Sequence, residues 1–245
     1  MTIENKVVVI TGGSSGMGAA TTKLALARGA KVVVGARNKD QLEQLATEVD
    51  NPKNFSYRVT DVTKKEDVQE LVGMAISQYG QLDVMYNNAG IMPQGPVDDP
   101  DRLIDWEKTI NTNIMGVLNG IVAAVPQMKQ QGQGLIMATD SVAGHVVYPN
   151  SAVYNGSKYA VKAIMEGLRQ EQHKNGIKTG IVSPGFVDTN LMDTINDDEI
   201  RNQIEAGKKG WLSPENIAEI AVFMMSQPEN VDINEILVRP TDQDV

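Results

Sequence analysis

Short runs of apolar, mostly β-branched residues alternate along the chain with longer segments whose apolar positions recur every three or four residues. The short runs are typical of buried strands in a parallel sheet, and the longer segments are typical of helices that cover such a sheet. Strands are predicted at residues 6–11, 31–36, 55–59, 82–86, 134–138, 178–182 and 235–238. Helices are predicted at residues 16–28, 40–49, 64–79, 103–130, 151–174 and 214–225. Pro126 can break the long helix at 103–130, because proline lacks the N–H that a helix interior needs.

Strands that alternate with helices form βαβ units, and successive βαβ units build a parallel sheet. No low-complexity linker and no internal repeat divides the chain. We therefore expect an α/β fold, a single doubly wound Rossmann-type domain over residues 1–245. Its parallel sheet of about seven strands is expected to be flanked by helices on both faces. Residues 187–210 are polar and are expected to be irregular or helical.

The amino-acid composition argues against several classes of function. Of the 245 residues 41% are hydrophobic, which is enough for a substantial core, and the formal net charge of -9 argues against broad binding to nucleic acid. The chain has no cysteine, which excludes disulfides and thiolate chemistry, and its two histidines argue against a histidine-based metal site but leave carboxylate sites open. No apolar run approaches the roughly 20 residues that span a bilayer, and no basic leader precedes the first strand. We therefore expect a cytoplasmic enzyme without a membrane partner.

A glycine-rich turn follows the first predicted strand. Glycines let the backbone turn tightly and let a pyrophosphate approach closely, and the helix N-terminus behind the turn offers free N–H groups. The spacing is Gly-x-x-x-Gly-x-Gly, and its place after a buried N-terminal strand predicts a nucleotide site. The alternative is a connection that merely turns the chain. Residues of the turn that are expected to contact the cofactor are Gly12, Ser14, Ser15, Gly16, Met17 and Gly18.

Tyr154 and Lys158 lie four residues apart on a predicted helix, so their side chains share one face. A free tyrosine has a pKa of about 10, and this pKa must fall by roughly 3 for action near neutral pH, which a nearby ammonium group favours. A tyrosine four residues before a lysine is by itself common by chance. The alternative interpretation is that both side chains are exposed on a helix surface and have no function. The pair becomes specific because Ser141 follows a predicted strand. Ser141 therefore lies at the carboxyl end of the sheet, where open α/β folds bind ligands.

Further motifs occur at matching distances from these residues. The full set is Thr11-Gly12-x-x-x-Gly16-x-Gly18, Asn87-Asn88-Ala89-Gly90, Asn113-Ile114-Met115-Gly116, the trio Ser141, Tyr154 and Lys158, and Ser183-Pro184-Gly185. With these motifs the chain resembles the short-chain dehydrogenase/reductase family over nearly its whole length. The closing residues 234–241 resemble a subgroup of NADP-dependent 3-hydroxy acid dehydrogenases and broad ketoreductases. The resemblance implies an oxidoreductase that transfers hydride between a nicotinamide cofactor and a carbonyl compound or secondary alcohol.

The resemblance also implies a catalytic set, which consists of Asn113, Ser141, Tyr154 and Lys158. Ser141 is expected to donate a hydrogen bond to the carbonyl oxygen, and Tyr154 is expected to act as the acid/base. Lys158 is expected to keep Tyr154 acidic and to bind the cofactor ribose, and Asn113 to hold a water that connects Lys158 to solvent. The assembly that the resemblance suggests is a homotetramer.

The end of the second predicted strand indicates which cofactor is bound. An NAD-type site usually has a carboxylate there, bonded to the ribose hydroxyls. By family register Ala36 occupies that position and Arg37 follows it, so an arginine is available for a 2′-phosphate. We therefore predict NADP(H), with an Arg37 that merely ends a strand in solvent as the alternative. By resemblance, further cofactor contacts are expected from Asn38, Asp61, Val62, Asn88, Ala89, Gly90, Tyr154, Lys158, Pro184, Gly185, Val187 and Thr189.

Two positions depart from the family pattern. Asp140 precedes the catalytic serine where a second serine is common, and Tyr86 precedes the Asn-Asn-Ala-Gly run where a small aliphatic residue is usual. Neither change removes a reacting group, and both can retune the pocket or the strand packing. His145 is expected to be a loop residue with a structural or solvent role, and a place at the mouth of the substrate pocket is the alternative.

Two other functions stay open at this point. A NAD-dependent alcohol dehydrogenase is disfavoured by Ala36 and Arg37, and a non-catalytic NADP(H)-sensing module is disfavoured by the intact catalytic set. The walls of the substrate pocket are expected in the loops at 91–95, 142–153 and 186–203. The side chains that suggest a partly apolar pocket are Val147, Tyr148, Phe186 and Met192.

Overall fold

The strands of the protein form one parallel sheet. The computed structural model describes residues 2–50, 52–206 and 210–244. The strands are β1 (Val7–Thr11), β2 (Lys31–Ala36), β3 (Phe55–Val59), β4 (Val84–Asn87), β5 (Gly134–Thr139), β6 (Ile177–Pro184) and β7 (Glu235–Val238). They lie in the order β3-β2-β1-β4-β5-β6-β7, and every neighbouring pair is parallel. The predicted seven-stranded doubly wound α/β fold is therefore confirmed.

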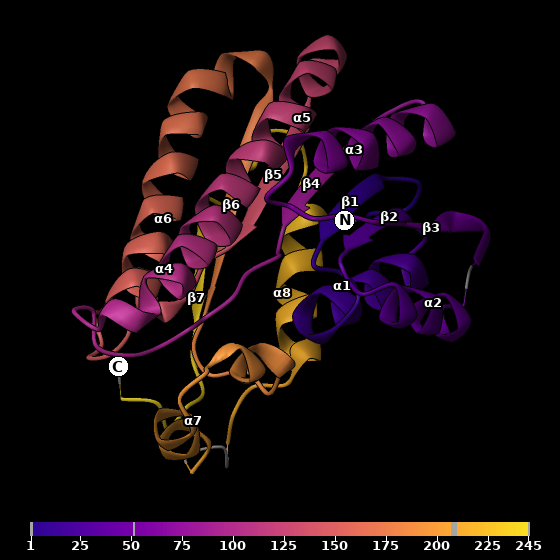
Figure 1. Ribbon diagram of the computed structural model, residues 1–245. Coiled ribbons are helices and arrows are strands. Elements are labelled where there is room, and N and C mark those ends of the chain that lie inside the picture. The colour runs from indigo at the N-terminus through magenta and orange to yellow at the C-terminus, as the bar shows by residue number, and fades with distance from the viewer. Residues whose placement is uncertain (1, 51, 207–209, 245) are drawn as a thin grey trace.

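Helices cover both faces of the sheet (Figure 1). They are α1 (Gly16–Ala27), α2 (Lys39–Glu48), α3 (Lys65–Tyr79), α4 (Leu103–Ile110), α5 (Gly116–Gln131), α6 (Ala152–Gln172), α7 (Asp198–Glu205) and α8 (Pro214–Met225). Among the described residues, no helix is both long enough and apolar enough to cross a membrane.

The core consists of two layers, one on each side of the sheet. Along β1, Val8 and Ile10 pack with residues of α1, α2 and α8, whereas Val7 and Val9 pack with residues of α3, α5 and α6. This alternation follows from the two-residue period of a strand. Because both faces of β1 are covered, all of its residues are buried, which explains why the strand is a continuous apolar run in the sequence.

The helix expected at 103–130 differs from the prediction. It consists of α4 and α5, which are joined by a π-helical turn at Asn111–Met115, and α5 continues through Pro126. The expected break near Pro126 is therefore wrong. The side chain of Asn113, which lies in this turn, hydrogen-bonds to the N–H and the C=O of Ile91, each at 2.9 Å, and so ties the turn to the loop after β4. Ala124 and Met128, which flank Pro126, are buried in the core and hold the helix against the sheet on both sides of the proline.

The strand order creates a crevice at one end of the sheet. β1 pairs with β2 on one side and with β4 on the other, so the chain leaves these strands in opposite directions. Ligands of doubly wound sheets bind outside the carboxyl ends of the strands at such a switch point. The glycine turn follows β1, Arg37 follows β2 and Ser141 follows β5, so the predicted site residues come from this end. Residues 187–210 contain a short helical segment at Asn190–Thr194 and α7, which lies at the lower edge of the view in Figure 1.

Candidate active site

The glycine turn brings β1, α1 and the end of β4 into contact. Gly12 has a φ of +64°, a left-handed conformation that glycine adopts without strain, and a Cβ there would lie 2.8 Å from the Cα of Ala89. A Cβ on Gly18 would overlap the carbonyl oxygen of Gly12 and the side-chain amide of Asn88. Gly18 therefore makes the close packing of the turn possible, although it does not itself line the cavity beside the turn.

The first turn of α1 lies at the cavity beside the glycine turn, and no side chain caps its backbone N–H groups. Ser15 precedes the helix with an extended backbone and makes no side-chain cap, and no acidic side chain lies in the first turn. Free N–H groups and the helix dipole together favour an anion at this position. The turn thus offers the environment that a pyrophosphate group requires.

A cavity of about 680 Å³ extends from the glycine turn past the ends of β2 and β4. Of the residues predicted to contact the cofactor, Gly12, Ser14, Ser15, Gly16, Met17, Arg37, Asn38, Asp61, Val62, Asn88, Ala89, Gly90 and Thr189 line it. Further lining residues that were not predicted as cofactor contacts are Gln41, Thr60, Ile91, Thr112, Asn190, Leu191 and Thr194. Ile91, Asn190, Leu191 and Thr194 lie in loops that the sequence analysis assigned to the substrate pocket, whereas Thr60 directly precedes the predicted Asp61.

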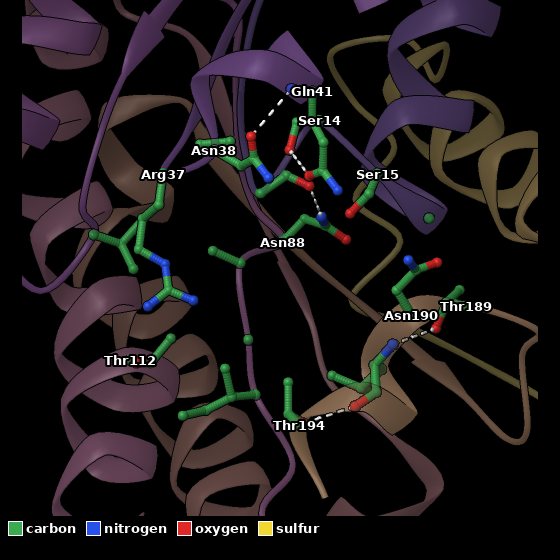
Figure 2. A pocket seen from close by; sticks show the side chains of 18 of the residues that line it. Ser14, Ser15, Arg37, Asn38, Gln41, Asn88, Thr112, Thr189, Asn190 and Thr194 are labelled. Carbon is green, nitrogen blue, oxygen red and sulfur yellow. Dashed lines mark hydrogen bonds between the residues drawn. The ribbon is translucent and has the colours of Figure 1, made fainter. Parts of the chain in front are cut away.

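Arg37 and Asp61 are the only charged side chains among the described residues that line this cavity. Arg37 is exposed and makes no ion pair with a described residue, and it lies on the opposite wall from Thr189 and Asn190 (Figure 2). The last residue of β2 is Ala36, which has no carboxylate. The end of β2 thus presents a guanidinium group without a competing acid.

The side chain of Asn88 fastens the glycine turn to the neighbouring strands. Its amide nitrogen donates to the carbonyl oxygens of Thr11 and Gly12, at 3.2 and 3.1 Å, and its amide oxygen accepts from Thr139 at 3.0 Å. Thr139 Oγ1 also hydrogen-bonds to the hydroxyl of the fully buried Tyr86 at 2.8 Å. Tyr86, which departs from the family pattern, therefore adds a hydrogen bond to the strands that carry the site. Burial raises the pKa of this tyrosine to about 12.

A second cavity of about 400 Å³ adjoins the first and shares Met17, Asn88, Gly90, Ile91, Thr189 and Leu191 with it. Of the predicted residues, Ser141, Tyr154, Lys158, Pro184, Gly185 and Val187 also line this cavity. The structure thus brings together three members of the expected catalytic set around one cavity.

Tyr154 and Lys158 are 5% and 6% exposed, and α6 carries both. The Lys158 Nζ donates to the carbonyl oxygen of Thr139 at 2.8 Å and lies 5.6 Å from the centre of the Tyr154 ring. Burial raises the pKa of Tyr154, a hydrogen bond with Ser141 lowers it and the charge of Asp140 raises it. In this structure the net direction is upward, opposite to the lowering expected from Lys158, because burial of the phenol outweighs the favourable contacts.

Asn113 lies beside these residues without lining either cavity. Its side chain is buried and is used in the bonds to Ile91 and in a bond to Ser157 Oγ at 3.1 Å. A Cβ built on Gly90 would lie 3.4 Å from Asn113 Oδ1 and 4.0 Å from Lys158 Nζ, so both side chains adjoin Gly90. The expected water between Asn113 and Lys158 stays a prediction.

Apolar side chains make up much of the second cavity. Met92, Val142, Met192, Ile200 and Ile204 line it, together with Tyr148, Phe186, Gln94 and Gln243. The predicted walls at Tyr148, Phe186 and Met192 are confirmed as lining. The expectation for Val147 is wrong, because this side chain is 65% exposed and does not line the cavity.

Comparison with known proteins tests the family resemblance that the sequence motifs indicate. A family model for short chain dehydrogenases matches residues 6–200. The chain belongs to the short-chain dehydrogenase family. An uncharacterized oxidoreductase of Staphylococcus saprophyticus is 44% identical over 243 residues, which cover 98% of each chain.

Two solved structures are similar over nearly the whole chain. An alcohol dehydrogenase of the archaeon Thermococcus sibiricus, in complex with 5-hydroxy-NADP, superposes with a TM-score of 0.86 at 28% identity and with 98% of both chains covered. A short-chain dehydrogenase/reductase of Burkholderia phymatum, in complex with NAD, superposes with a TM-score of 0.86 at 25% identity, with 97% of this chain and 90% of that chain covered. The protein is therefore an oxidoreductase of the short-chain dehydrogenase type.

In this short-chain dehydrogenase, Arg102 joins the two loops that flank the second cavity. It donates to the carbonyl oxygen of Gln94 at 2.7 Å and pairs with Asp99 at 3.2 Å and with Asp197 at 2.9 Å. Asp197 caps the N-terminus of α7, whose Ile200 lines the cavity. One half-buried guanidinium group thus connects the loop after β4 to the segment that covers the substrate side.

Proposed function

We propose that the protein is an NADP(H)-dependent carbonyl reductase that also oxidises the corresponding secondary alcohols. The observation that carries the proposal is the set of side chains in the apolar cavity, which adjoins the cavity beside the glycine turn. Ser141, Tyr154 and Lys158 line the apolar cavity, and Lys158 adjoins Gly90, which lines both cavities. A hydroxyl donor, a phenol and an ammonium group in one cavity match the needs of a proton transfer to a carbonyl oxygen.

The residues of the first cavity fit a phosphorylated dinucleotide. The free N–H groups of α1 suit the pyrophosphate, and the glycines leave room for close approach. Arg37 would hold a 2′-phosphate, and the absence of an acid at Ala36 removes the repulsion that such a phosphate would meet. Asp61 and Val62 would border the adenine, and Pro184, Gly185 and Val187 the nicotinamide. The relative crystallised with 5-hydroxy-NADP supports this choice, and the relative crystallised with NAD makes NADH the comparison to test.

The chain itself supplies orientation and the proton. When bound, the cofactor supplies the hydride. Ser141 donates a hydrogen bond to the carbonyl oxygen and fixes its direction, and Tyr154 delivers the proton to the same oxygen. The raised pKa of the buried Tyr154 keeps its hydroxyl protonated at neutral pH, which is the form that the reduction needs. Lys158 holds the cofactor ribose, and the apolar walls exclude water from the reacting carbonyl.

A substrate and cofactor panel tests the proposal. Purified protein is assayed with ketones, β-keto esters and hydroxy acids, each with NADPH or NADP⁺ and with NADH or NAD⁺, and Tyr154→Phe protein measures the background. We expect reduction of carbonyl compounds with NADPH and a lower kcat/KM with NADH. A preference for NADH overturns the cofactor assignment. Tight NADPH binding without turnover of any compound would indicate a sensing module.

A further inference from the structure

Asp140 places a carboxyl group in the protein interior directly behind the expected catalytic residues. It follows β5 and precedes Ser141, its backbone N–H donates to the carbonyl oxygen of Val182 at 2.8 Å, and the residue is 2% exposed. Neither carboxyl oxygen has a side-chain hydrogen-bond partner among the described residues. A buried carboxyl without such partners is costly, so its surroundings must compensate for its charge or hold it neutral.

The turn that follows Ser141 packs directly on the Asp140 carboxyl group, because a Cβ on Gly144 would overlap it. Asp140 also lines the second cavity, together with Ser141, Tyr154 and Lys158. Its charge acts on whatever titratable groups surround it.

Charged and titratable groups face Asp140 from three elements. Helix α6 contributes Tyr154, Lys158 and Lys162, the turn after Ser141 contributes His145, and β7 contributes Glu235. Three of these groups, His145, Lys162 and Glu235, pair with one another. Glu235 lies 2.6 Å from His145 Nε2 and 3.2 Å from Lys162 Nζ, and it accepts a hydrogen bond from Ser183 at 2.9 Å.

Among the described residues, the charge that most favours ionised Asp140 is that of Lys158, ahead of Lys162, and Asp140 is the one charge that acts on Lys158. Lys158 is nearly as deeply buried as Asp140, and its ammonium group donates to the neutral carbonyl oxygen of Thr139. Burial lowers the pKa of Lys158, and the charge of Asp140 raises it. Conversely, burial raises the pKa of Asp140 to about 7, and the charge of Lys158 lowers it. Each group therefore favours the charged form of the other.

From this arrangement we infer that Asp140 is a positioning residue, the buried counter-ion that keeps the ammonium group of Lys158 charged at the cofactor ribose. The role at the ribose rests on the function proposed above, whereas the charge coupling does not. Asp140 lines the second cavity, but in this role it acts through Lys158. His145 and Lys162 pair with Glu235 on the side of Asp140 that faces β7.

The same residues raise the question of a metal ion. One ligand atom each from Asp140, His145 and Glu235 lies within 4.8 Å of the others. However, Lys162 Nζ lies 3.1 Å from His145 Nδ1 and beside Glu235, so an ammonium group already supplies the positive charge that a cation would bring. A metal bound to Nε2 would also leave the Nδ1–H group facing that ammonium group, which is unfavourable.

The coupling is measurable in the protein without cofactor. NMR titration of ¹³Cγ-labelled aspartate and of ¹⁵Nζ-labelled lysine reports the pKa of Asp140 and of Lys158, with signals assigned by their loss in Asp140→Asn and Lys158→Met. Asp140→Asn is expected to lower the pKa of Lys158 by about one pH unit, and Lys158→Met to raise the pKa of Asp140 by a similar amount, because the coupling of two sites is reciprocal. If the Asp140→Asn protein is poorly folded, Asp140→Ser tests the same charge with a smaller side chain.

Glu235→Gln provides the matched control. It removes a carboxylate from the same cluster and should lower the pKa of Asp140, because the charge of Glu235 raises that pKa. It should leave the pKa of Lys158 unchanged. Equal responses of Lys158 to Asp140→Asn and Glu235→Gln, or no response to either, would overturn the counter-ion role. So would a shift of the Asp140 signal on addition of Zn²⁺, which would identify the cluster as a cation site.

A second experiment measures the affinity for NADPH as a function of pH. Loss of the Lys158 charge weakens ribose binding at alkaline pH, so Asp140→Asn should move this alkaline loss to lower pH by about one pH unit. Below that range the affinities of the two proteins should agree. A purely structural role would weaken binding equally at every pH and contradicts the inference. If the parent protein binds no NADPH, the proposed function fails, and the NMR titrations still decide the coupling of Asp140 and Lys158.

Discussion

The two cavities adjoin, yet they are built in different ways. The proposed cofactor side includes turns that directly follow β1, β2 and β4, and side-chain-to-backbone hydrogen bonds such as those of Asn88 hold these turns to one another. The proposed substrate side is lined by the turn after β5 and by the segment after β6, which contains Met192 and α7 and is joined to the rest by apolar packing and by Arg102. Under the proposed function, this difference places binding of a common cofactor on the sheet and substrate choice on connections that can change without disturbing it.

If this division is correct, variants on the two sides should separate cleanly. Changes on the cofactor side should alter cofactor affinity and leave the KM of the carbonyl substrate in place. Changes on the substrate side should do the reverse. Changes at Tyr154, the proposed proton donor, should alter neither binding step, only the chemistry.

The largest effect is expected from Tyr154→Phe. Removal of the proton donor should lower kcat by at least about 100-fold, which lies within the usual contribution of an acid/base group. NADPH affinity should be nearly unchanged, because the ring and the packing around it remain. Steady-state kinetics with NADPH and calorimetric titration of the cofactor check both parts. Retained turnover would mean that another group delivers the proton.

Arg37→Ala tests the cofactor side. A guanidinium contact to a phosphate is charge-assisted and contributes about 1.5–3 kcal/mol, so NADPH affinity should fall roughly 10- to 100-fold. NADH affinity should stay almost constant, since NADH has no phosphate at that position, and addition of Ala36→Asp should reverse the preference. Calorimetric titration of both cofactors measures this.

Arg58→Ala is the matched control for net charge. Arg58 pairs with Glu70 on the surface and does not line the cofactor cavity, so its loss should leave both affinities unchanged. Equal losses for NADPH and NADH in Arg37→Ala would mean that Arg37 has a structural role.

Arg102→Ala tests the substrate side. It removes the half-buried bonds to Gln94 and Asp197 that fix two walls of the apolar cavity, and the KM of the carbonyl substrate should rise about threefold to tenfold. NADPH affinity should not change. Arg169→Ala, which breaks an exposed ion pair with Glu166 on α6, is the control and should leave the KM constant. A loss of NADPH affinity in Arg102→Ala would show that the two sides are not independent.

The same division explains what could be predicted from the sequence. β1 is buried on both faces and Arg37 directly follows a strand, so hydrophobic pattern and position were sufficient to locate them. The π-helical turn at Asn113 was missed, and the bonds that tie it to the loop after β4 could not be foreseen because Ile91 lies 22 positions away in the sequence. The pairing of His145 with Glu235 was missed for the same reason, since β7 and the turn after β5 meet only in the folded sheet.

The smallest effect is expected from Tyr86→Phe, which tests whether the hydrogen-bonded framework beneath the cofactor side can be weakened without loss of function. Tyr86 is fully buried, and its hydroxyl bonds to Thr139, which keeps Asn88 as a second partner. Loss of one such bond should lower the free energy of unfolding by about 1 kcal/mol, or the Tm by about 2–4 °C for a chain of this size, with kcat and NADPH affinity unchanged. Tyr79→Phe is the control, because the buried Tyr79 hydroxyl has no hydrogen-bond partner among the described residues and its removal should cost nothing. Thermal unfolding and cofactor titration of the two variants decide the point. A marked loss of NADPH affinity in Tyr86→Phe would mean that the hydroxyl positions Asn88 and the glycine turn, so that framework and binding site on this side of the molecule act as one unit.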